Sequence, residues 1–426
     1  MKAVPPRSFR MVCEAERIAS VQSLLKAEGY DFEPEPFSSH CYKLLHEPRP
    51  LGVSLAAFFG YIYIQNRSSM LPPLALDPAK GCAVLDICAS PGGKSGFLAQ
   101  LTGPTGFVLA NEPTPARLGT LRANLRACNL LQTATCAYHG GKLPLPSRPW
   151  QAILLDPPCS GWGTAEKHPR VLKIWRGDKI QNLIALQRQL LRRAADMLAP
   201  GGRLVYSTCT TNEAENEAQT RFAREELGLE CEDMPPFPGF VWEQGRGGVG
   251  MLRVDGKKSL AQDFFLARLR KPGNAVKDGR EDGMREGGGL QRQERPLTAA
   301  ALAGPCCDPA LLPPGHAAVY GGHVRFIPAL AGACIPPGFV WQAALLGRLV
   351  RKNSGEFFSP VPRLRVLPPP GAGSSVVLDD VREVAALLCG QRVRAPLKSG
   401  EAGLWWRDLP LGCVSVRQGR VVAAFR

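Results

Sequence analysis

Short apolar runs alternate with segments of helical periodicity over residues 82–271. The runs predict strands at residues 82–87, 107–111, 135–138, 151–155, 203–206 and 264–269. Between the fourth and fifth of these strands, residues 180–198 place apolar side chains on one helical stripe, and Pro200-Gly201-Gly202 is expected to end that helix. This alternation predicts an α/β fold whose mostly parallel sheet is covered on both faces.

The segments on either side of the α/β domain, which we place at 79–271, differ from it in composition. Residues 1–78 begin with a predicted helix over 14–28, which Gly29 closes in the C-cap position. Residues 272–296 have almost no large apolar side chain, so we expect a flexible linker there. Residues 297–426 are rich in Pro, Gly and Val. They predict a small β-rich domain, with strand-like pieces at 323–327, 364–367 and 413–416.

Charge and cysteine usage narrow the class of protein. The net charge of +15 favours a polyanionic partner, and nucleic acid is the first candidate. The 14 cysteines include no CxxC pair, which argues against a metal site and against a disulfide framework and suits a reducing compartment. No apolar run has the roughly 18 residues of a membrane span, and the N-terminus lacks the apolar core of a signal peptide. We therefore expect a cytoplasmic protein without membrane contact.

Two cysteines are set in short, distinctive segments. They are Asp156-Pro157-Pro158-Cys159 and Ser207-Thr208-Cys209-Thr210, and each segment follows an apolar run that reads as a strand. A residue at the carboxyl end of a strand in an open α/β sheet faces the crevice where ligands bind. Two thiols that face one crevice indicate nucleophilic chemistry.

A glycine turn follows the first predicted strand of the α/β domain. The sequence there is Asp86-Ile87-Cys88-Ala89-Ser90-Pro91-Gly92-Gly93-Lys94-Ser95, and an apolar helix comes next. A P-loop would need glycine at the position of Cys88, and the GxGxxG of a dinucleotide site is absent. A turn for S-adenosylmethionine remains, with a strand-end acid and the glycine loop holding the methionine part. Glu112 ends the next strand, where an acid can take both ribose hydroxyls.

These segments together resemble the sun-type RNA 5-methylcytosine methyltransferases. The glycine turn is similar to the family's DxCAxPGGK signature, and the two cysteine segments are similar to its DAPCSG and YSTCT elements. The likeness also includes residues 60–73, Glu215-Asn216-Glu217 and the last predicted strand, and covers residues 5–271. A weaker likeness, around residues 409–412, is to the PUA-type tail of the bacterial small-subunit ribosomal RNA branch. Together, the two resemblances imply a Rossmann-like class I S-adenosylmethionine methyltransferase sheet with an N-terminal extension, residues 1–78. They also imply a PUA-like RNA-binding C-terminal domain.

The resemblance also implies roles for individual residues. Cys209 would be the nucleophile that adds to C6 of cytosine, and Cys159 would assist proton removal from C5 and release of the enzyme. Asp156 would contact the N3/N4 edge of the base. Lys94 would lie close enough to lower neighbouring thiol pKa values. The cofactor, S-adenosyl-L-methionine, would be held by Cys88, Ala89, Ser90, Pro91, Gly92, Gly93, Lys94, Glu112, His139 and Asp156. No metal is implied.

Departures from the family pattern leave alternatives open. His139 stands where the family commonly has the aspartate that contacts adenine, and Trp162 stands where bacterial relatives often have glutamate. An aromatic residue beside the target could stack on RNA or pack against a neighbouring loop. A DNA-type cytosine methyltransferase would use Cys159 as nucleophile, and an amino-group methyltransferase would carry an aromatic residue there. We expect a monomer that modifies small-subunit ribosomal RNA; transfer RNA methylation, or ribosome assembly with little catalysis, are the alternatives.

Overall fold

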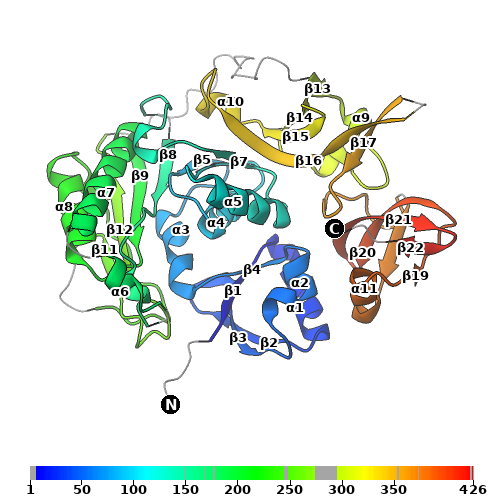
Figure 1. Ribbon diagram of the computed structural model, residues 1–426, viewed down its shortest axis with the longest axis horizontal. Helices are drawn as coiled ribbons and strands as arrows, with labels where there is room; N and C mark the ends of the chain where they lie inside the picture. Colours follow the sequence, from blue (N-terminus) through cyan, green and yellow to red (C-terminus); the bar gives the residue numbers. More distant parts are fainter. Residues whose placement is uncertain are drawn as a thin grey trace.

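The computed structural model describes residues 6–148, 150–166, 168–175, 178–243, 248–273, 295–352, 355–372, 374–422 and 425. The linker expected at 272–296 therefore lies almost entirely outside the described residues. Three β-sheets organise the chain (Figure 1). Among the helices in the described ranges, none is both long and apolar enough to span a membrane.

A 13-stranded sheet forms the centre of the molecule (Figure 1). Its parallel part has the order β9-β8-β5-β6-β7, and β12 joins β9 antiparallel at one side. The bounds are β5 Ala83–Asp86, β6 Phe107–Asn111, β7 Thr133–Cys136, β8 Trp150–Leu155, β9 Leu198–Thr208, β10 Glu230–Cys231, β11 Met251–Val254 and β12 Phe264–Arg270. The α/β fold expected from the sequence is confirmed, but the whole sheet is mixed, because only β9, β8, β5, β6 and β7 run parallel and the strands on either side pair antiparallel.

Helices cover both faces of the parallel strands. On one face lie α3 (Leu71–Leu76), α4 (Gly93–Thr102) and α5 (Pro115–Ala127), and on the other lie α7 (Asp178–Met197) and α8 (Glu217–Glu225). Val84 packs in the first layer and its neighbour Leu85 in the second, because successive side chains of a strand point to opposite faces. A short α6 (Val171–Ile174) precedes α7.

The helix predicted at 180–198 is confirmed as α7, but its end differs from the prediction. Strand β9 begins at Leu198, so Pro200-Gly201-Gly202 lies inside the strand rather than terminating the helix. The register between β8 and β9 shifts between Trp150 and Ala152, and this irregularity accommodates the turn-forming residues within the pairing.

The N-terminal region forms a separate four-stranded antiparallel sheet of order β2-β3-β1-β4. Its elements are β1 Ser8–Met11, α1 Ile18–Ala27, β2 Asp31–Glu35, β3 Ser38–His46, α2 Leu55–Phe58 and β4 Ile62–Ile64. The predicted first helix is confirmed, with a 3-10 turn at Ala15–Arg17 ahead of it. Gly29 follows with φ of +86°, the left-handed conformation that glycine adopts without strain.

The first half of the β-rich C-terminal part extends the central sheet. Strand β16 pairs antiparallel with β7, placing Trp341 opposite Cys136, and the order continues β15-β14-β13, while β17 also pairs with β16. The bounds are β13 Arg295–Leu297, α9 Ala299–Leu302, β14 Gly315–Tyr320, β15 His323–Pro328, α10 Ala331–Cys334, β16 Trp341–Lys352 and β17 Gly355–Pro360. The sequence pattern did not indicate that these strands would join the catalytic sheet.

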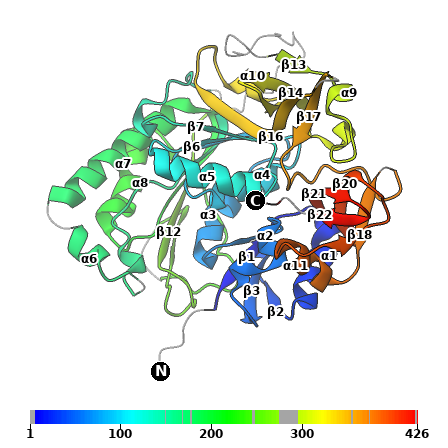
Figure 2. The same ribbon diagram turned by 45° about the vertical axis from the view of Figure 1, so that its right-hand side comes forward.

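The second half forms a five-stranded sheet that packs on the N-terminal sheet (Figure 2). Its elements are β18 Ser375–Leu378, α11 Val381–Leu388, β19 Val393–Arg394, β20 Gly400–Trp406, β21 Leu409–Arg417 and β22 Arg420–Val422. Tyr61 donates a hydrogen bond to the carbonyl of Pro410 across this contact, at 2.6 Å. The strand expected at 364–367 is not formed; Leu364 and Leu367 are buried in a loop, so their apolar character reflects burial rather than strand pairing.

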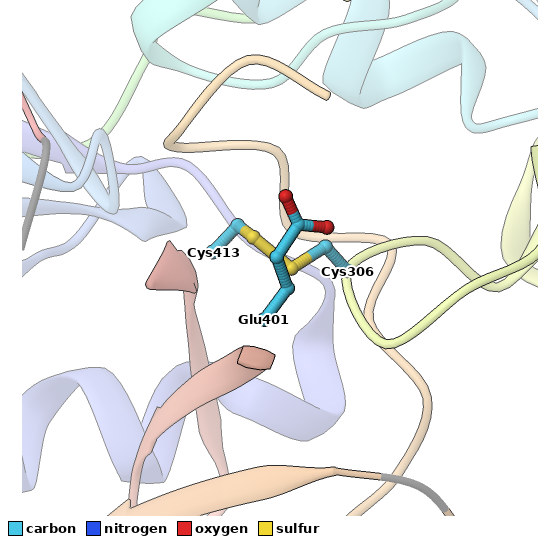
Figure 3. A group of neighbouring side chains, drawn as sticks. All are labelled: Cys306, Glu401 and Cys413. Carbon is cyan, nitrogen blue, oxygen red and sulfur yellow. A yellow bond between two sulfur atoms is a disulfide. The ribbon is translucent and has the colours of Figure 1, made fainter. Parts of the chain in front are cut away.

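A disulfide joins Cys306 to Cys413, which are 107 residues apart (Figure 3). The expectation that the cysteines form no disulfide framework is wrong for this pair. The sequence contains no signal for this bond, because the adjacent Cys306 and Cys307 do not indicate a distant partner. Glu401 lies beside the two sulfur atoms, and the three donor atoms are within 4.8 Å of one another. The sulfurs are bonded to each other, so this group offers no thiolate to a metal ion.

Candidate active site

The residues singled out from the sequence gather at the carboxyl ends of the parallel strands. Asp86 ends β5, Glu112 follows β6, Asp156 follows β8 and Cys209 follows β9. Since parallel strands end at the same edge of a sheet, four segments that are distant in sequence meet there.

The two cysteine segments place their thiols in contact. The Sγ atoms of Cys159 and Cys209 are 3.4 Å apart, and both residues are half-buried. The hydrogen bond from Cys159 lowers the pKa of the Cys209 thiol, despite the opposing effect of burial. The same hydrogen bond, together with burial, raises the pKa of Cys159 well above its usual value. Cys209 is thus the thiol that is more readily ionised, which is the property a nucleophile needs.

Asp156 lies beside this pair with both carboxylate oxygens engaged. Lys94 pairs with Oδ2 at 2.7 Å, and the Ser207 hydroxyl donates to Oδ1, also at 2.7 Å. Lys94 comes from the first turn of α4 and Ser207 from β9, so the glycine turn and the second cysteine segment both hold this carboxylate. The Asp156 carboxylate opposes ionisation of Cys209 and Lys94 favours it, so the hydrogen bond from Cys159 remains the main cause of the lowered pKa. The structure therefore brings together the four residues to which the resemblance gave catalytic roles.

A buried carboxylate to which sequence reasoning assigned no role binds both cysteine segments. Glu215 is 0% exposed and accepts four hydrogen bonds. The donors are the amide and hydroxyl of Ser160, at 2.9 and 2.5 Å, Gln187 at 3.0 Å and Asn212 at 2.9 Å. Ser160 follows Cys159, and Asn212 belongs to the loop after Cys209. Glu215 thus fixes the two cysteine segments relative to each other.

Gln187 is the other residue of this network that sequence reasoning missed. It occupies the polar position in the apolar stripe of α7, and it is fully buried. Its amide donates to Pro158 as well as to Glu215, both at 3.0 Å. A polar residue at a helical position that should face the core was the only signal in the sequence.

The glycine turn is braced from outside by α5. The Ser90 hydroxyl donates to the carbonyl of Arg117, and Asn124 donates to the carbonyl of Pro91. Gly92 has φ of +105° and precedes the first turn of α4. At Gly93, an added Cβ would lie 2.7 Å from the ring of Tyr63, so the turn also packs tightly against the N-terminal region.

Two acids and a buried thiol line the inner side of the turn. Asp86 accepts from Ser95 at 2.6 Å through one oxygen, while its other oxygen is buried with no side-chain or backbone partner among the described residues. Burial raises the pKa of Asp86 to about 7, and it raises that of Cys88 well above the usual value. Glu112 is 2% exposed and accepts from the amide of Thr114 at 2.9 Å. An unpaired acid, a glycine turn and a second acid fit a ligand with an ammonium group and a ribose, as S-adenosylmethionine has.

The remaining sequence candidates take no direct part in this constellation. Ala89 is buried and donates its amide to Asn111 at the end of β6. His139 is exposed beyond β7, and within the described ranges its imidazole has no hydrogen-bond partner. Trp162 is half-buried with its indole nitrogen turned inward and unpartnered, while the next residue, Gly163, donates to the carbonyl of Cys209.

Comparison with known proteins agrees with this geometry. Residues 73–270 match the family described as 16S rRNA methyltransferase RsmB/F. The ribosomal RNA small subunit methyltransferase F of Escherichia coli is 36% identical over 275 residues, which cover 62% of this chain and 57% of that protein. The chain thus spans just over half the length of the curated relatives it matches.

Solved structures share the fold of this region. A methyltransferase homolog from Pyrococcus horikoshii is 32% identical with a TM-score of 0.53, covering 62% of this chain and 86% of its own. NSun6 from the same organism is 21% identical with a TM-score of 0.55, covering 64% and 92%, and it supports the fold alone. Residues 73–270 are thus similar to the 16S rRNA methyltransferase RsmB/F family, and they share their fold with the methyltransferase homolog.

Proposed function

We propose that this protein transfers a methyl group from S-adenosylmethionine to C5 of a cytosine in RNA, with small-subunit ribosomal RNA as the substrate. The observation that carries this proposal is the contact between the thiols of Cys159 and Cys209, whose pKa values are shifted in opposite directions beside the Asp156–Lys94 pair. A pair of contacting thiols with unequal acidity suits a reaction in which one thiol forms a covalent bond and the other assists its release.

The two thiols would act in sequence on the base. The Cys209 thiolate adds to C6 of cytosine, and the electron pair of the C5–C6 double bond moves to C5, which becomes nucleophilic toward a methyl group. After C5 is methylated, its proton leaves, the double bond re-forms and the bond between C6 and Cys209 breaks. Cys159 is in contact with the same sulfur and assists this proton removal. Asp156, held by Lys94 and Ser207, contacts the N3/N4 edge of the base and orients it beside the two thiols.

The chain's own residues account for cofactor binding. When bound, S-adenosylmethionine supplies an electrophilic methyl on its sulfonium. The unpaired oxygen of Asp86 is available to an ammonium group, and the carboxylate of Glu112 to the ribose hydroxyls. The exposed His139 lies beyond the neighbouring strand β7.

Cofactor affinity should depend on the ionisation of Asp86. Burial raises the pKa of this carboxyl to about 7, so below that pH it is largely protonated in the free protein and cannot pair with an ammonium group. We expect the affinity for S-adenosylhomocysteine to fall by up to about tenfold per pH unit below neutrality and to level off above it. Calorimetry from about pH 5.5 to about pH 8 measures this profile.

The Asp86→Asn variant should bind weakly and lose most of this pH dependence. Asp77→Asn, which changes an exposed carboxylate, is the matched control and should retain the wild-type profile. If the Asp86→Asn variant keeps the wild-type pH profile, Asp86 does not take part in cofactor binding.

The substrate class rests on two observations. The chain carries a net charge of +15, which suits a polyanion, and its curated relatives are named for methylation of small-subunit ribosomal RNA. In duplex or stacked RNA the C6 atom of a base is out of reach of a side chain, so the target cytosine must turn out of its stack to reach Cys209.

A labelling assay tests the proposed function. The protein is incubated with S-adenosylmethionine labelled in the methyl group and with small-subunit ribosomal RNA that lacks base modifications. We expect label in 5-methylcytidine after digestion of the RNA to nucleosides. Label in an amino-methylated nucleoside would contradict methylation at C5. Label in transfer RNA alone would contradict the ribosomal RNA substrate but would agree with methylation at C5.

A further inference from the structure

A hollow of about 290 Å³ lies between α5 and the strands that extend the central sheet, away from the two thiols. Its charged lining comes from both sides. The α5 side contributes Arg122 and Arg126, strand β15 contributes His323 and Arg325, and β16 contributes Arg348. The hollow exists because β16 pairs with β7, which brings the extension beside α5.

The positive charge of this hollow is unbalanced. No aspartate or glutamate lines it, and within the described ranges none of its four arginines forms an ion pair. Burial lowers the pKa of Arg325, and the nearby charge of Arg122 lowers it further. Like charges held this close repel each other unless an anion lies between them.

Hydrogen bonds orient two of the arginines and leave the other two available. Arg122 donates to the hydroxyl of Thr135, and Arg325 donates to the carbonyl of Ala343, both at 2.9 Å. A guanidinium has five N–H donors, so each retains several for a ligand. Arg126 and Arg348 are exposed, and their side chains have no polar partner in the part of the chain that the structure describes.

A second hollow of about 200 Å³ adjoins the first and shares Arg325 and Gln342 with it. It is also lined by Trp341 and by Tyr320, which is 46% exposed. The side-chain oxygen of Gln342 is buried without a partner, so it can accept from a hydroxyl or amino group. Arg325 beside the exposed ring of Tyr320, the half-buried Trp341 and an acceptor matches the phosphates, bases and 2′-hydroxyls of unpaired RNA.

We propose that these two hollows, the α5–β15 groove, bind the backbone phosphates of an unpaired stretch of the RNA substrate outside the target cytosine. The proposal rests on the proposed function, because it assumes an RNA substrate. Strands β9 and β7 are four strand spacings apart and the groove lies beyond β7, so it is at least about 19 Å to the side of Cys209. A strand that presents one cytosine to Cys209 can cover that distance within a few nucleotides.

The test compares two double variants in an RNA-binding titration without methyl donor. The groove variant is Arg126→Gln with Arg348→Gln, and the control is Arg221→Gln with Arg224→Gln, which removes two exposed arginines from α8 across the molecule. The probe is unmodified small-subunit ribosomal RNA, bound at several salt concentrations. Affinity for S-adenosylhomocysteine is measured in parallel and should be unchanged in both variants.

We expect the salt dependence of binding to be shallower in the groove variant by about 0.7 per lost phosphate contact, or about 1.4 in the log–log slope. Between about 50 and about 200 mM salt, the wild type should therefore lose about sevenfold more affinity than the groove variant. The control variant should keep the wild-type slope.

Three other outcomes would overturn the assignment. Equal slopes for the groove variant and the wild type would show that the α5–β15 groove does not bind RNA phosphates. The proposed RNA methylation would be unaffected by that result. If the wild-type protein does not bind RNA, both the RNA ligand of the groove and the proposed RNA substrate are contradicted. If polyglutamate competes for the groove as effectively as RNA of equal charge, the ligand of the groove is an acidic polypeptide instead.

Discussion

Replacing Cys209 by alanine is expected to abolish methyl transfer, whereas replacing Cys159 by alanine is expected to trap the enzyme on its RNA. Without Cys209 no bond forms to C6, so C5 stays a poor nucleophile and the rate should fall on the order of 10⁴-fold or more. Without Cys159 the bond still forms but its release is impaired. The complex should therefore survive denaturation and migrate as protein joined to RNA.

The contact between the two thiols is the physical reason for this asymmetry. Their sulfur atoms are 3.4 Å apart, and the hydrogen bond between them lowers the pKa of Cys209 while raising that of Cys159. Denaturing gels with labelled RNA distinguish the two variants, and Cys88→Ala, which removes a buried thiol nearby, serves as the control that should not trap RNA. Trapping by Cys209→Ala instead would assign the attack to Cys159, as in the DNA-type mechanism.

Glu215→Gln is expected to impair both stability and catalysis. The carboxylate accepts four hydrogen bonds in a site with no exposure, and a glutamine offers only one acceptor oxygen. At least two donors would lose their partner, at about 1–3 kcal/mol each, so we expect a loss of about 2–6 kcal/mol in the free energy of unfolding. Because Ser160 and Asn212 belong to the two cysteine segments, the distance between the thiols should also become less well defined.

Urea unfolding and single-turnover kinetics measure the two effects separately. Glu213→Gln is the matched control, because that glutamate is exposed two residues away in the same loop and should change neither quantity. S-adenosylhomocysteine binding should persist in Glu215→Gln where the protein is folded, since none of the donors to Glu215 belongs to the glycine turn. A variant with wild-type stability and rate would show that the carboxylate does not position the cysteine segments.

The sequence predicted the parts of the fold that depend on local pattern. The parallel strands and α7 follow from apolar periodicity, and the site edge follows from the rule that parallel strands end together. The proximity of Cys159, Cys209 and Asp156 was expected for this reason. Their chemical roles were implied by the family resemblance and remain predictions.

Features that depend on contacts between distant segments could not be predicted. The pairing of β16 with β7 joins residues more than 200 positions apart, and neither strand's own pattern identifies its partner. Buried polar networks are equally hidden: Gln187 interrupts an apolar stripe, but only the fold shows that it binds Glu215. The bond between Cys306 and Cys413 likewise depends on the approach of the loop after α9 to strand β21 of another sheet.

RNA that carries 5-fluorocytidine at the modified position tests the central claim most directly. Fluorine at C5 cannot leave as a proton does, so after methyl transfer the bond between C6 and the attacking sulfur cannot be broken by elimination. We expect the wild-type protein to remain attached to this RNA, and mass spectrometry of the digested complex to find the nucleotide on the peptide that contains Cys209. Attachment through Cys159, or methyl transfer to cytidine RNA with no adduct on the fluorinated RNA, would contradict the mechanism.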